Sequence, residues 1–167
     1  MKIYNYINIY DLIIFCGLLF TYFTTYILFK YSLKKAYPKF QCVNTKLIYT
    51  PLMVRKNLLN LNTNGRSRLL GFYVMDMFLD IFILLALNQL IKHFDFFDLY
   101  YHQATLLVLF RSVFAILEKF LLLLITNFFP FKNHLLCLLS ALFTLFKHFC
   151  FLGYILLFIY TFIINCF

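Results

Sequence analysis

Five ionisable side chains lie near the middle of two long apolar stretches, residues 69–91 and 104–126. They are Asp76, Asp80, Arg111, Glu118 and Lys119. A charge at bilayer depth costs about 3 kcal/mol or more unless it is paired or hydrated. Two kinds of chemistry suit such groups: a path that carries protons or ions, or ion pairs that fasten helices and subunits together. We expect the second kind, on helices that face protein rather than lipid.

The spacing of these residues predicts how they would meet. Asp76 and Asp80 are four residues apart and share one helix face. If the two stretches run antiparallel, Lys119 reaches the depth of Asp76, and a pair between them is allowed. Glu118 lies about 100° around the helix from Lys119 and should face a different neighbour. Arg111 lies about 10 Å along the axis from Glu118, so we expect each to find a partner on another helix or another chain.

Other chemistry has little support in the sequence. The chain contains no glycine-rich phosphate loop, no serine next to a histidine or carboxylate that could act as its general base, no metal-spaced carboxylates and no C-x-x-C pair of cysteines. A haem or quinone contact through His102 or His148 has little support, because haem ligation needs histidines at facing depth on two helices and only His148 is near a predicted span. We therefore expect no enzymatic activity of its own, no metal and no directly bound cofactor, apart from a phospholipid.

The composition predicts an all-α integral membrane protein. Of 167 residues, 64% are hydrophobic and 13% are charged, against about 25% charged residues in soluble domains. We expect a single membrane domain with four spans, each long enough for about 30 Å of hydrocarbon. The predicted spans are 12–29, 69–91, 104–126 and 149–167.

The last part of the chain has two possible arrangements. Residues 135–167 are apolar except for Lys147 and His148. In the first arrangement these two residues lie near the inner interface, 135–146 forms an interfacial or re-entrant helix, and 149–167 spans the membrane. In the second, the whole segment is one long tilted helix.

The connection at 30–68 is strongly basic and contains no acid. A basic loop between two spans stays on the matrix or cytoplasmic side, which would leave both termini on the opposite side. Nucleic-acid binding would suit a soluble basic domain but not a loop between spans. We expect this loop to contact a neighbouring subunit or anionic lipid headgroups such as cardiolipin. The residues expected in that contact are Lys34, Lys35, Lys39, Arg55, Lys56, Arg66 and Arg68.

The chain is rich in Phe, Leu, Tyr, Asn and Lys and poor in Gly and Ala, and we expect no import presequence. With its four predicted spans and basic loop, it resembles the orphan Ymf-type membrane proteins encoded by ciliate mitochondrial genomes. This resemblance implies a subunit of a respiratory-chain complex in the mitochondrial inner membrane, held among other membrane subunits. Among these complexes, we expect cytochrome c oxidase first, then complex I, then ATP synthase.

Two single features resemble proton-translocating proteins. Arg111 within an apolar helix is similar to the proton-channel subunit of rotary ATP synthase, and Glu118 followed by Lys119 is similar to the antiporter-like subunits of complex I. The flanking Gly, Asn or Pro patterns of those families are missing here. The alternatives to a structural and assembly subunit are thus a proton-path subunit of either complex and a free-standing membrane transporter.

Overall fold

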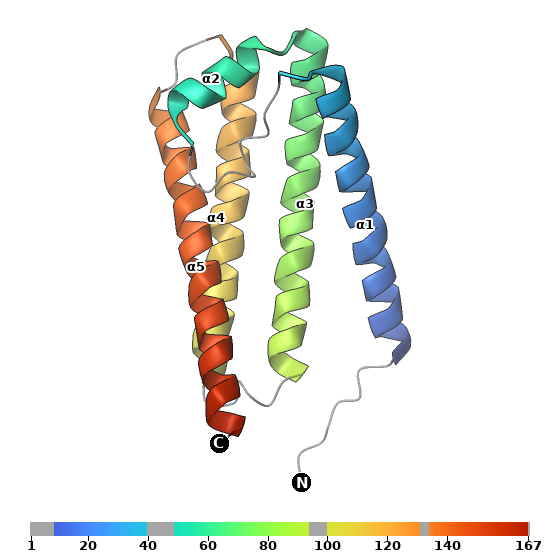
Figure 1. Cartoon of the computed structure of the whole chain (residues 1–167), viewed down its shortest axis with the longest axis vertical. Helices are drawn as coiled ribbons and strands as arrows, with labels where there is room; N and C mark the ends of the chain where they lie inside the picture. The colour runs from blue at the N-terminus through green and yellow to red at the C-terminus, as the bar shows by residue number, and fades with distance from the viewer. Residues whose placement is uncertain (1–8, 40–48, 94–99, 131–133, 167) are drawn as a thin grey trace.

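The computed structural model describes residues 9–39, 49–93, 100–130 and 134–166. These ranges contain five helices and no strand, which confirms the all-α class (Figure 1). The helices are α1 (Ile9–Ala36), α2 (Pro51–Leu59), α3 (Thr63–His93), α4 (Tyr101–Asn127) and α5 (His134–Cys166).

The four long helices run side by side, each antiparallel to the next one along the chain (Figure 1). Helix α4 packs against both α3 and α5, whereas α1 packs mainly on α3. The short helix α2 lies across one end of the bundle and contacts α5 (Figure 1). The helices α3, α4 and α5 therefore form the body of the molecule, with α1 on its flank.

Helix α2 forms where the sequence gives a clear start signal. The hydroxyl of Thr50 accepts a hydrogen bond from the backbone N–H of Met53 at 3.4 Å, and Pro51 occupies the first turn, where its missing N–H costs nothing. Val54 and Leu58 are both 2% exposed and fasten the helix to the end of the bundle. The basic connection between α1 and α3 is therefore helical over Pro51–Leu59.

The loop expected at 30–68 is shorter in the structure, because the flanking helices extend into it. Lys34 and Lys35 form the last turn of α1, where cations interact favourably with the negative end of the helix. The side chain of Asn62 accepts from the backbone N–H of Gly65 at 2.8 Å and caps the start of α3. Residues 40–48 of the predicted loop lie outside the described residues.

Two helices are long and apolar enough to cross a membrane, by length and composition: Thr63–Asn88 and His134–Ile164. The second of these bears on the two arrangements left open for the end of the chain. Helix α5 is one continuous helix of 33 residues, about 50 Å long. The division into a segment at 135–146 and a span at 149–167 is therefore wrong, and the single long helix is the arrangement that forms.

The core consists of two apolar clusters at different heights in the bundle. The larger one lies near α2 and includes Phe72, which is 0% exposed and stacks with Tyr26 and Phe29 of α1. The smaller one lies near the opposite end and includes Val108 and Tyr154. Along α3, α4 and α5, the charged residues occupy the positions between these clusters.

Candidate functional site

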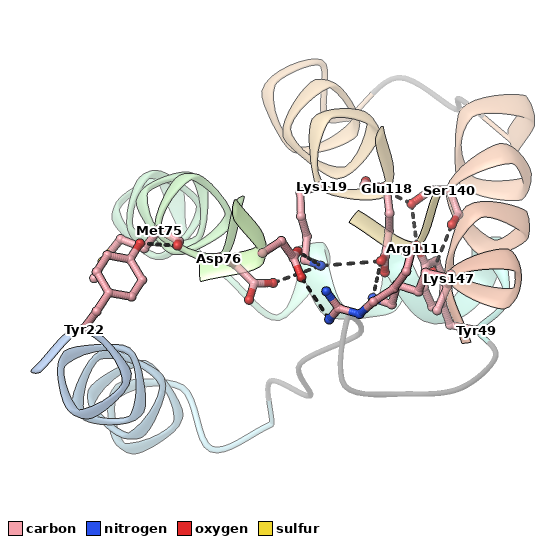
Figure 2. A network of polar contacts seen from close by, with 11 residues as sticks. Tyr22, Tyr49, Met75, Asp76, Arg111, Glu118, Lys119, Ser140 and Lys147 are labelled. Atoms are coloured by element: carbon pink, nitrogen blue, oxygen red, sulfur yellow. Dashed lines mark hydrogen bonds and ion pairs between the residues drawn. The ribbon is translucent and has the colours of Figure 1, made fainter. Parts of the chain in front are cut away.

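Three acids and three bases meet between α3, α4 and α5 (Figure 2). Their formal charges cancel, and all six side chains are at most 15% exposed. The group, which we call the ion network, consists of Asp76 and Asp80 from α3, Arg111, Glu118 and Lys119 from α4, and Lys147 from α5.

Lys119 is the centre of the ion network. Its Nζ lies 3.1 Å from Oδ2 of Asp76, 3.5 Å from Oδ2 of Asp80 and 3.5 Å from Oε2 of Glu118. The pair with Asp76 is the one that the spacing allowed. One ammonium group thus serves three carboxylates, two of them on the neighbouring helix α3.

The remaining two bases each pair with one acid. Lys147 of α5 donates a hydrogen bond to Oε2 of Glu118, which is fully buried. Arg111 donates to Oδ1 of Asp80 at 3.3 Å, and its guanidinium group lies 5.9 Å from the centre of the Phe151 ring. Glu118 and Arg111 therefore find partners on other helices of the same chain, and the pairs that we expected to fasten subunits together are intramolecular.

Lys147 is a member of the ion network that the sequence did not reveal. We expected it near the inner interface, whereas the structure buries its side chain beside Glu118, between the two apolar clusters. The sequence of α5 does contain a pattern that predicts an inward-facing Lys147. Ser140, Thr144 and Lys147 are all buried and share one helix face at spacings of four and three residues. Tyr154 and Thr161 continue this buried stripe along α5.

Ser140 links the ion network to the segment before α2. The hydroxyl groups of Ser140 and Tyr49 are hydrogen-bonded, and Ser140 also donates to the backbone carbonyl of Glu118 at 3.3 Å (Figure 2). Burial raises the pKa of Tyr49 above its ordinary value, and the nearby Glu118 carboxylate raises it further. The phenol therefore remains protonated and available for this hydrogen bond.

Four buried polar atoms in and beside the ion network have no hydrogen-bond partner among the described residues: Nη1 of Arg111, Oγ of Ser112, Oε1 of Glu118 and Nε2 of His148. Buried polar atoms of this kind usually bind ordered water. The ion network can therefore do two things chemically. It can hold three helices together, and with water it can relay protons between its acids and bases.

The basic residues predicted to contact lipid or a subunit gather at one end of the bundle. Lys34 and Lys35 end α1, Arg55 and Lys56 lie on α2, and Arg68 follows the first turn of α3. Six of the seven predicted residues are exposed, and Arg66 is half-buried. The guanidinium group of Arg66 instead lies 4.8 Å from the centre of the Phe129 ring.

The described residues contain no group of three or more His, Cys, Asp or Glu side chains placed to hold a metal ion. In comparisons with models of protein families, with curated proteins and with solved structures, the chain matched none.

Proposed function

We propose that this chain is a non-catalytic integral membrane subunit of a mitochondrial respiratory-chain complex, in which it supports structure and assembly. Its four long helices cross the inner membrane, and the basic end that carries α2 lies in the matrix. The observation that carries the proposal is the neutral, internally paired ion network. Because three acids and three bases neutralise one another inside the bundle, the long helices can present apolar side chains to their surroundings.

The outer surface is suited to a membrane and to membrane neighbours. Helix α1 packs mainly on α3 and leaves large apolar side chains exposed, among them Phe20 at 71% and Leu28 at 62%. On α5, Phe149 is 60% exposed and Leu156 is 58% exposed. Apolar surface of this extent would be unstable in water but is favourable against acyl chains or other membrane helices.

The choice of complex follows from the resemblance to ciliate mitochondrial membrane proteins. Cytochrome c oxidase is the first candidate, and complex I and ATP synthase follow. A supporting subunit of the oxidase would contribute to electron transport through the assembly of the complex, without an active site of its own.

A proton path in complex I or ATP synthase is the second candidate, and a specific observation favours it. From Lys147 to Glu118, Lys119, Asp80 and Arg111, acids and bases alternate at contact distances across three helices. Oε1 of Glu118 and Nη1 of Arg111 are buried without a protein partner and could bind water. Chains of ionisable groups inside a membrane mark proton relays in pumps and transporters.

The test is purification of the tagged chain from its native membrane, followed by native gel electrophoresis and identification of the chains that co-migrate. We expect migration with a respiratory complex, at a mass far above that of the 20.1 kDa chain. Migration as a 20.1 kDa monomer or a small homo-oligomer would contradict the proposal and favour a free-standing transporter.

Two conservative variants separate the structural subunit from the proton path. Glu118→Gln and Asp80→Asn each remove an exchangeable proton site with little change of shape. If the complex assembles but loses coupled proton transport, the proton path is correct. If the variants impair assembly, or if transport persists in the assembled complex, the structural role stands.

A further inference from the structure

The outward face of α2 carries two cations between two leucines. Leu52, Arg55, Lys56 and Leu59 follow one another at spacings of three, one and three residues, so they lie on one side of the helix. All four are exposed, with Leu52 at 71% and Leu59 at 64%. Neither leucine helps to bury the core, and neither cation belongs to a described ion pair.

This face is presented in a fixed orientation across the end of the bundle (Figure 1). The opposite side of α2 is buried through Val54, Asn57 and Leu58, and Leu61 just after the helix is 3% exposed. The cap from Thr50 fixes the start of the helix. The outward side chains are therefore held in place by the core.

The charge at this end of the bundle is of one sign. From residue 12 to residue 75 the sequence contains no acid. Five acids follow. Asp76, Asp80 and Glu118 are engaged in the ion network, and Asp95 and Asp98 lie outside the described residues. Among the described residues, no acid is paired with the cations on α2 at the surface, and an anionic surface outside the chain is complementary to them.

We propose that the outward face of α2 docks on the anionic phospholipid headgroups of the membrane around the bundle. Arg55 and Lys56 contact the phosphates, while Leu52 and Leu59 enter the boundary between headgroups and acyl chains. Cations flanked by large apolar side chains are typical of helices that lie in this interface. The docking site does not include Arg66, which is engaged with Phe129. The proposal rests on the integral membrane location proposed above.

The test uses the full chain reconstituted in nanodiscs of phosphatidylcholine, with and without anionic lipid. The readout is the affinity for a labelled anionic lipid, from quenching of a probe near α2. Each cation contributes about fivefold to such binding, so Arg55→Gln with Lys56→Gln should weaken it about 30-fold. The charge-conserving pair Arg55→Lys with Lys56→Arg is the matched control and should retain most of the affinity.

The anionic lipid is supplied in two forms, one with a single phosphate and one with two. Binding of either form that depends on Arg55 and Lys56 supports the site, and tighter binding of the second form identifies a diphosphate headgroup such as that of cardiolipin. Leu52→Ser with Leu59→Ser should also reduce the affinity, because it removes the apolar contacts.

Equal affinity of the glutamine variant and the original chain would overturn the docking site. Equal loss in the charge-conserving variant would also overturn it. If the affinity is unchanged but these substitutions release an acidic protein from the native complex, that protein is the partner instead. Failure of the chain to remain in carbonate-washed membranes would contradict the membrane location itself, which is a separate result.

Discussion

The ammonium group of Lys147 on α5 is hydrogen-bonded to the carboxylate of Glu118 on α4, which is fully buried. This pair joins the two most extensively packed helices of the bundle at the height of the ion network. Its consequence for stability depends on whether one partner or both are removed, because a lone buried charge costs far more than no charge.

We predict that Lys147→Met or Glu118→Leu alone destabilises the bundle by about 3 kcal/mol or more. Each leaves a charged partner without its main counter-ion. The double variant Glu118→Leu with Lys147→Met should be destabilised by less than either single variant, since an apolar pair can replace a buried ion pair at small cost. Unfolding in mixed detergent, analysed as a double-mutant cycle, measures the coupling. Simple additivity of the two single effects would show that the pair is not energetically linked.

Lys119 and Arg111 provide a second comparison. Lys119 is 3% exposed in its side chain and contacts three carboxylates, whereas Arg111 is 15% exposed and contacts one. We expect Lys119→Met to cost about 2 kcal/mol more than Arg111→Met, because it leaves more buried negative charge without a partner. The same detergent unfolding assay gives both values. Adding Asp76→Asn to Lys119→Met should restore part of the loss, and a further loss would contradict the assigned contact.

Much of this ion network could be predicted from the sequence. Asp76, Asp80, Arg111, Glu118 and Lys119 were identified because a charge inside a long apolar stretch is conspicuous, and helix geometry correctly allowed a pair between Lys119 and Asp76. Lys147 was misplaced for a physical reason. Its depth is set by the register of α5 against α4, which is a tertiary property, and a lone lysine in an apolar run can equally extend to an interface.

The boundaries of the helices were predicted less well than their existence. The expected loop at 30–68 includes residues 30–36 of α1, all of α2 and residues 63–68 of α3. The local signals for α2, Thr50 followed by Pro51, are present in the sequence, but nine helical residues gain stability chiefly from packing. That packing is supplied by Val54 and Leu58 against the bundle. The four-span topology stays a prediction, since two helices have the length and apolarity to cross a membrane.

Tyr49 gives a prediction about the segment before α2. Its hydroxyl is hydrogen-bonded to Ser140, and its side chain is 2% exposed. Tyr49→Phe should destabilise the protein by about 1 kcal/mol through loss of this hydrogen bond. Tyr31→Phe is the matched control, because Tyr31 is 65% exposed, and it should have no measurable effect. Equal stability of the two variants in detergent unfolding would show that the Tyr49 hydroxyl contributes nothing.

Phe72 is predicted to hold α1 against the rest of the bundle. It is 0% exposed and stacks with Tyr26 at 5.0 Å and with Phe29 at 6.0 Å between ring centres. Phe72→Ala should cost about 3 kcal/mol or more through the cavity and the lost ring contacts. Phe72→Ala should also lower the yield of an engineered disulfide between α1 and α3, because α1 would be held less closely against α3. Phe78→Ala is the control on the same helix, since Phe78 is 53% exposed, and it should leave both measurements nearly unchanged.

The start of α3 provides the last prediction, because two of its glycines differ in their surroundings. A Cβ atom at Gly65 would lie 2.7 Å from the ring of Tyr37, whereas one at Gly71 would meet no atom within 4 Å. The Tyr37 hydroxyl donates to Oδ1 of Asn62 at 2.6 Å, and the same oxygen caps the helix at Gly65. Gly65→Ala must displace the ring and weaken this hydrogen bond, so we expect a loss of about 1 kcal/mol in the free energy of unfolding.

Gly71→Ala should instead stabilise the helix by about 0.5 kcal/mol, because alanine loses less backbone entropy than glycine. Opposite shifts of the two variants in thermal unfolding would verify the contact with Tyr37, and stabilisation by both would refute it.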